Sequence, residues 1–172
     1  LAAAPVLATV FPGNSSLATQ LKTVARMIAV RQRLGMSRQV FFVATGGFDT
    51  HSGQLEDQPG LLGNLSASLA AFHAATVELG VAAEVTTFTQ SDFGRSLTSN
   101  GNGSDHAWGG VHLVLGGAVK GRVVYGEYPV LQIGAERDIG GGRLIPQLSS
   151  DQYVATLARW FGVDAARLAE IA

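Results

Sequence analysis

The sequence predicts an α/β domain with a layered, mostly parallel sheet and flanking helices. The main observation is the apolar run from Val40 to Ala44 within residues 39–45, which are mostly β-branched or aromatic without alternation and so are typical of a strand covered on both faces. Residues 81–88 resemble a second strand, and helical spacing of apolar residues precedes each run. Because parallel strands need a crossover between them, the order helix, strand, helix, strand favours a parallel sheet.

The first predicted helix follows the turn at residues 12–15, where Asn14 or Ser15 can cap its first turn. Its apolar side chains recur at spacings of four, three and four, which places them on one face of a helix. They are Leu17, Leu21, Val24 and Ile28. Gly35 is expected to end this helix.

A second helix is expected from about Pro59 to Leu79, ending at Gly80. A loop rich in Gly, Asn and Ser, residues 96–110, follows the second predicted strand, and long loops of this kind are often functional. Two short strands are expected at residues 111–115 and 122–125. A capping box at residues 149–152 predicts a last short helix. The apolar stripe of the second helix comprises Leu61, Leu65, Leu69 and Phe72.

The composition suits one globular domain, because 172 residues can bury a substantial core. A net charge of -1 lacks the excess of positive charge that is typical of nucleic-acid-binding domains. No apolar run reaches the roughly 18 residues of a transmembrane helix. The lack of cysteine excludes disulfides, zinc–thiolate sites and cysteine nucleophiles. Since the chain begins at Leu1 rather than Met, we expect residues 1–172 to be a single domain from a larger protein.

Three polar clusters offer ligands for a metal ion. Asp49 and His51 follow the first predicted strand, Asp92 follows the second, and Asp105 and His106 lie in the long loop. In open α/β sheets, ligands bind outside the carboxyl ends of the strands. Carboxylate and imidazole groups suit Zn, Mn or Mg. The alternative is structural: Asp49 caps a helix and His106 bonds within its own loop.

Other polar residues carry weaker predictions. The guanidinium of Arg95 could grip two oxygens of a phosphate or sulfate, and a surface salt bridge with Asp92 or Asp105 is the alternative. His73 beside a helical stripe and His112 inside a strand are interpreted as structural. The chain contains no Walker loop and no Gly-x-Ser-x-Gly elbow, which argues against P-loop and α/β-hydrolase chemistry.

Three stretches make the sequence familiar: RQVFFVATGGFDTHSGQ at residues 38–54, TTFTQSDFGRSLTSNGNGSDHAWGG at residues 86–110, and GGAVKGRVVYGEYP at residues 116–129. They resemble a bacterial family of unknown function with GGFDTH and SDFGR motifs. That family is grouped with the alkaline phosphatase and sulfatase-like superfamily, and its members often carry a twin-arginine export signal. The resemblance implies a periplasmic or secreted protein whose fold is like the C-terminal half of alkaline phosphatase.

The superfamily resemblance also implies a chemistry. Its enzymes hydrolyse phosphate or sulfate esters at a two-metal site, with a Ser or Thr nucleophile near the start of the domain and Asp and His ligands later. Asp49 and His51 resemble the first later pair of ligands, and His106 resembles the final His. Asp92 resembles the Asp of an Asp–His pair, in which Phe93 takes the place of the second ligand.

We therefore expect a metal-dependent hydrolase of small-molecule or polymeric anionic esters. Asp49, His51, Asp92 and His106 would be ligands, Asp105 a possible further ligand, and Arg95 would bind substrate. Because the resemblance places the nucleophile before Leu17, we expect an N-terminal half of the parent protein to be missing and this chain alone to be inactive. The alternative is a non-catalytic metal- or anion-binding module of an exported protein.

Overall fold

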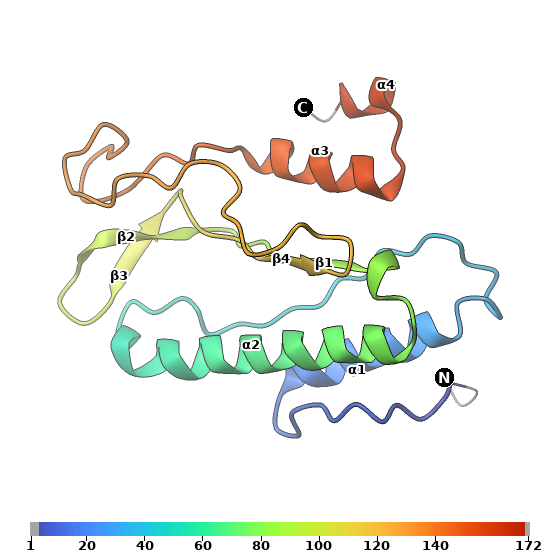
Figure 1. The fold of residues 1–172 in the computed structure, drawn as a ribbon. Coiled ribbons are helices and arrows are strands. Elements are labelled where there is room, and N and C mark those ends of the chain that lie inside the picture. The colour runs from blue at the N-terminus through green and yellow to red at the C-terminus, as the bar shows by residue number, and fades with distance from the viewer. Residues whose placement is uncertain (1–3, 171–172) are drawn as a thin grey trace. The chain divides into compact units, whose positions relative to one another are not determined.

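The computed structural model describes residues 4–170, which form two compact units (Figure 1). The first unit comprises the described residues up to Gln90 together with Ser99–Ser104 and His112–Gly121. The second comprises Ser91–Thr98, Asp105–Val111 and the chain from Arg122 onward. The prediction of a single domain over residues 1–172, whose two ends lie outside the described part, stays a prediction.

Helix α1, Ser16–Ala29, confirms the first predicted helix. The Ser15 hydroxyl accepts a 3.0 Å hydrogen bond from the backbone N–H of Ala18, so Ser15 caps the helix as the sequence allows. The end at Ala29 is earlier than the predicted end at Gly35, because the chain passes into successive turns after Val30. All four residues of the predicted stripe are buried: Leu17, Leu21, Val24 and Ile28.

Helix α2, Gln54–Glu78, begins five residues before the predicted start at Pro59. Proline lacks a backbone N–H and usually marks the first turn of a helix, which is why the sequence favoured a later start. Here Pro59 lies inside the helix, in its second turn. From the predicted stripe, Leu69 and Phe72 are buried.

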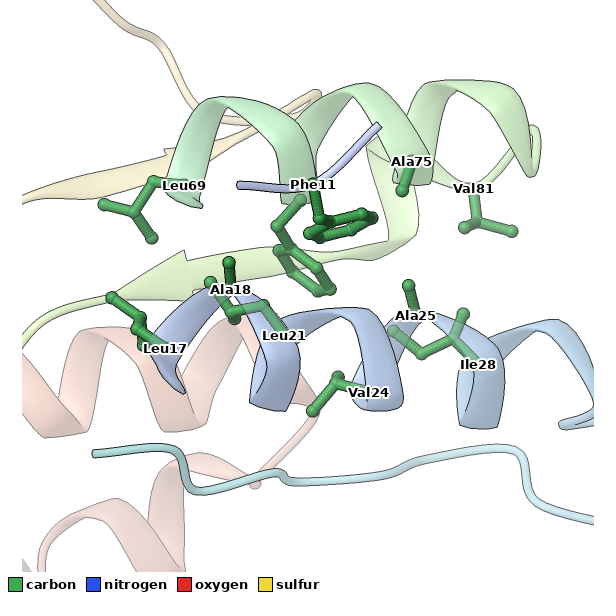
Figure 2. Close-up of a cluster of buried hydrophobic side chains, with 11 residues drawn as sticks. Phe11, Leu17, Ala18, Leu21, Val24, Ala25, Ile28, Leu69, Ala75 and Val81 are labelled. Atoms are coloured by element: carbon green, nitrogen blue, oxygen red, sulfur yellow. The ribbon is translucent and has the colours of Figure 1, made fainter. Parts of the chain in front are cut away.

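The hydrophobic core of the first unit lies where α1 faces α2 (Figure 2). Phe11, from the segment before α1, lies between the two helices and is 9% exposed. Phe72 from α2 is 3% exposed, and Val81 extends the cluster beyond the end of α2. The core is therefore built by residues that helical periodicity could predict, completed by side chains from the flanking segments.

The predicted parallel sheet is wrong. Residues 39–45 are extended but belong to no strand, and Val40 and Phe42 are 78% and 91% exposed. The Gln20 side chain holds Ala44, donating to its carbonyl oxygen at 2.8 Å and accepting from its N–H at 3.0 Å. Strand propensity describes how side chains fit a pleated, half-buried surface, so an apolar run stays a single extended segment where no strand lies beside it.

The second predicted strand is wrong over most of its length. Ala82–Glu84 forms a 3-10 helix, η1, and only Thr86–Phe88 is a strand, β1. Strand β1 pairs antiparallel with β4, Val114–Gly116, so that Thr86 lies opposite Gly116. Neither two-stranded sheet among residues 4–170 is parallel, and the expected likeness to the C-terminal half of alkaline phosphatase is corrected with it.

The loop predicted at residues 96–110 is instead partly ordered as a hairpin. Strand β2, Gly94–Ser99, pairs with β3, Ser104–Ala107, through a turn of four residues. The Asn100 side-chain oxygen closes this turn by accepting hydrogen bonds from the N–H groups of Asn102 and Gly103. An Asn side chain that binds the backbone two and three residues on is a strong turn former, which explains why a polar, Gly-rich stretch makes a hairpin.

In the second unit, helix α3, Ser150–Phe161, confirms the predicted last helix and its capping box between Ser149 and Gln152. A four-residue helix, α4, Ala165–Leu168, follows. The strand expected at residues 122–125 is absent from the described chain. In the irregular stretch before α3, hydrogen bonds from backbone N–H groups, chiefly that of Gly134, lower the pKa of Asp138.

None of the helices within residues 4–170 has the length and apolar character required to cross a membrane.

Candidate metal centre

The segment Asp49–Thr50–His51 directs its side chains alternately. The Thr50 residue is 3% exposed, whereas the Asp49 and His51 side chains are 59% and 47% exposed. Residues two apart in an extended segment share a side, so Asp49 and His51 point the same way and their atoms Oδ1 and Nε2 lie 3.0 Å apart. Gly47, with φ of 93°, provides the left-handed backbone conformation that precedes this segment.

Hydrogen bonds to its backbone and to the Thr50 side chain hold this segment in place. The N–H of Ser104 donates to the carbonyl oxygen of Thr50 at 3.4 Å. The Asn100 side-chain amide donates to the carbonyl oxygen of His51 at 3.0 Å. From α2, Gln58 donates to the Thr50 hydroxyl at 3.5 Å. The position of the Asp49 and His51 side chains is therefore set by the hairpin turn and by the start of α2.

His106 lies on β3, and its ring is stacked on Phe93. The two ring centroids are 3.9 Å apart and the ring planes differ by 9°. The guanidinium carbon of Arg95 lies 5.1 Å from the centroid of the same Phe93 ring. Stacking fixes the plane of an imidazole and so limits the directions in which its nitrogens can bind.

Asp49, His51 and His106 form an exposed group that could hold a metal ion. Their ligand atoms all lie within 4.8 Å of one another. Ligand atoms around a tetrahedral Zn ion are roughly 3.3 Å apart, so small side-chain movements would suffice. One carboxylate and two imidazoles fit Zn or Mn well, whereas Mg prefers a shell of oxygen atoms. The predicted divalent cofactor thus has a suitable donor set in this structure.

The group does not include Asp92 or Asp105. Asp92 lies exposed just before β2, and Asp105 lies exposed on β3 next to His106. Adjacent residues of a strand point to opposite faces, which separates Asp105 from an ion bound by His106. The roles of Asp92 and Asp105 as ligands, and of Arg95 in anion binding, stay predictions.

The two remaining histidines lie outside this group. His73 on α2 is half-buried and borders an open cavity of about 280 Å³ beside Leu115 and Val119. Burial lowers the pKa of His112, which favours its neutral form at pH 7. Because His73 and His112 lie outside the candidate ligand group, they can serve as controls when Zn binding to His51 and His106 is measured.

Comparison with known proteins identifies a family. Residues 10–170 match the family described as "Protein of unknown function (DUF1501)". The chain belongs to the DUF1501 family. No curated protein and no solved structure matches it. The expectation of a family of unknown function is confirmed for this DUF1501 domain, whereas its relation to the alkaline phosphatase superfamily stays a hypothesis.

Sequence reasoning missed two residues that support the candidate ligands of the DUF1501 domain. The sequence marks Phe93 only as the absence of a ligand, whereas in the structure its ring is the stacking partner of His106. The sequence places Asn100 in a polar loop, whereas in the structure its side chain donates a hydrogen bond to the backbone of His51. The Asn-Gly-Asn-Gly run at residues 100–103 signals a tight turn, but sequence alone does not say which segment that turn contacts.

Proposed function

We propose that this DUF1501 domain carries the metal site of a metal-dependent hydrolase that acts on phosphate or sulfate esters. The observation that carries the proposal is the exposed group of Asp49, His51 and His106, whose ligand atoms lie within 4.8 Å of one another. Zinc sites with three protein ligands keep a fourth position open for water or substrate, and that arrangement is the catalytic type. Exposure of all three side chains leaves this position accessible.

The chemistry follows from the open position. A bound divalent ion lowers the pKa of a coordinated nucleophile and offsets negative charge on the group being transferred. Asp49 would supply negative charge to the site, and the two imidazoles would supply directional nitrogens. The sequence resemblance to the sulfatase-like superfamily supports phosphate or sulfate esters as the substrate class, and it supports export to the periplasm or medium. Fractionation of cells expressing the intact gene tests the location.

Arg95 is the proposed anion-binding residue. Its guanidinium lies over the ring of Phe93, which also stacks on His106. A guanidinium can stack on an aromatic ring, and its planar array of N–H donors matches two oxygens of a phosphate or sulfate. Arg95 would therefore bind the substrate oxyanion next to a metal held by His106.

Oxyanion binding tests this function without requiring turnover by this chain. The measurement is calorimetric titration with inorganic phosphate and with sulfate, in the presence and absence of Zn or Mn. We expect anion binding that depends on the metal and is lost in Arg95→Ala. Arg38→Ala, an exposed arginine in another part of the chain, is the matched control and should bind normally.

Each other result has a definite meaning. Metal binding without anion binding would contradict the hydrolase and favour a non-catalytic metal-binding module. Anion binding that is independent of metal would contradict the proposed link between Arg95 and the metal site. No metal binding at all would reject the proposed function.

A further inference from the structure

We propose that Asn100 and Gly103 are positioning residues for the metal ligand His51; this inference rests on the proposed metal site. The turn between β2 and β3 lies directly against the Thr50–His51 peptide. Neither residue offers a group to the ion itself. Their contribution would be to hold the His51 backbone so that its imidazole stays next to the Asp49 carboxylate.

The Asn100 side chain is used at both ends. Its oxygen accepts hydrogen bonds from the N–H groups of Asn102 at 3.2 Å and Gly103 at 2.9 Å. Its amide nitrogen donates to the carbonyl oxygen of His51 at 3.0 Å. A single side chain thus shapes the turn and also ties it to the ligand segment.

Glycine is required at position 103 because the turn leaves no room for a side chain there. A Cβ at this position would collide with the carbonyl oxygens of both Thr50 and His51. The next residue, Ser104, donates its N–H to the Thr50 carbonyl, and its hydroxyl donates to the Gln54 side chain at 2.7 Å. Because Gly103 has no side chain, the turn can lie close against the backbone of the Thr50–His51 segment, while the Asp49 and His51 side chains remain exposed.

The chain offers a matched control. Asn102 lies in the same turn and has the same side chain, but only its backbone takes part in the hydrogen bonds described, including the bond from the N–H of Gln54 to its carbonyl oxygen at 3.2 Å. Asn102→Ala therefore removes an asparagine from the turn while leaving in place the bonds that Asn100 and Ser104 make to the Thr50–His51 segment. A general effect of mutating the turn would appear in both variants, whereas a positioning effect would appear only in Asn100→Ala.

The experiment measures Zn affinity by calorimetry and metal-free melting temperature for the whole chain and its Asn100→Ala, Gly103→Ala and Asn102→Ala variants. Loss of a residue that orients a metal ligand typically lowers affinity by about 10-fold or more. We expect this loss in Asn100→Ala and Gly103→Ala, with normal affinity in Asn102→Ala. A purely structural turn would instead lower the melting temperature and leave the affinity of the folded protein unchanged, which would overturn the inference.

Amide hydrogen exchange of Ser104 provides a second readout that needs no metal. Its N–H is bonded to Thr50, so release of the turn should speed its exchange by about 10-fold or more in Asn100→Ala, and Asn102→Ala should match the wild type. Unchanged exchange in Asn100→Ala would contradict positioning. If the wild type bound no Zn but Asn100→Ala still exchanged faster, the proposed function would fail while the structural link between the turn and His51 stood.

Discussion

Helix α1 buries its apolar stripe against α2, whereas the extended segment at residues 39–51 keeps Val40, Phe42, Asp49 and His51 exposed. The helix satisfies its own backbone hydrogen bonds and needs a partner only for its side chains. The extended segment is tied to the rest of the first unit by hydrogen bonds with side chains such as Gln20 and Asn100. The helix pair supplies most of the buried core, Phe41 and Val43 anchor the segment against it, and the end of the segment presents the candidate ligands.

The largest effect is expected from a substitution that disrupts the packing of α1 against α2. Phe72 is 3% exposed, and Phe→Ala substitutions in protein cores typically cost about 3–5 kcal/mol of unfolding free energy. We expect Phe72→Ala to show this loss in chemical denaturation while the Zn affinity of the molecules that remain folded is unchanged. A fall in affinity greater than the unfolded fraction explains would show that the core and the ligand segment are not separate.

The next largest effect is expected from removing a candidate ligand from the extended segment. His51→Ala removes an exposed ligand, so we expect Zn affinity to fall by at least about 10-fold while the metal-free melting temperature stays within the range of ordinary surface substitutions. Calorimetric titration and thermal melting measure the two quantities. If the melting temperature falls and affinity does not, Asp49 and His51 are a structural turn.

A smaller effect tests the support of His106. Phe93→Leu removes a ring stack of the kind worth about 0.5–1.5 kcal/mol. Because the stack is already present without metal, we expect Zn affinity to fall by at most about 10-fold. Phe42→Leu is the control, because Phe42 is 91% exposed. Equal affinities for the two variants would mean that stacking on Phe93 does not orient His106.

The smallest effect concerns pH and the segment before α1. Glu78 accepts hydrogen bonds from the side chain and N–H of Thr9 and from the N–H of Ala8, and these bonds lower its pKa. A carboxylate with a lowered pKa in the fold adds stability above its unfolded pKa, and this stability is lost as the pH falls through the folded pKa.

Melting temperatures across the acidic pH range test how much the hydrogen bonds to the Glu78 carboxylate contribute to stability. Glu78→Gln should melt slightly below the wild type at pH 7, and the difference should shrink only as the pH falls through the lowered folded pKa of Glu78, where the wild-type carboxyl becomes protonated as well. Glu136→Gln, at an exposed glutamate in the other unit, should show no such convergence. A difference that persisted at low pH would mean that the charge of Glu78 is not what holds Ala8 and Thr9.

Prediction from sequence succeeded where the structure is local. The cap at Ser15, the stripe from Leu17 to Ile28 and the capping box at Ser149 each depend on residues a few positions apart. The sheet failed because strand pairing depends on distant partners: the run at residues 39–45 has strand composition, but its side chains do not report whether another strand lies beside it.

The candidate site shows the same limit. Asp49 and His51 could be paired from sequence because they are two residues apart, and His106 was proposed from the polar cluster in its loop as well as from the resemblance. Asp92 was proposed with equal weight but is not in the ligand group. The contribution of Asn100 could not be predicted, because its hydrogen bond to His51 joins residues 49 positions apart in the chain.

The most direct test of the metal centre uses the four histidines of this chain as internal references for one another. Zn is titrated into ¹⁵N-labelled protein while the ring nitrogens of all four are followed by NMR. Our account predicts that one ring nitrogen of His51 and one of His106 take on the shift of a Zn-bound nitrogen, while those of His73 and His112 stay unchanged. Rings of His51 and His106 that remain unchanged at saturating Zn, or a response confined to His73 or His112, would contradict it.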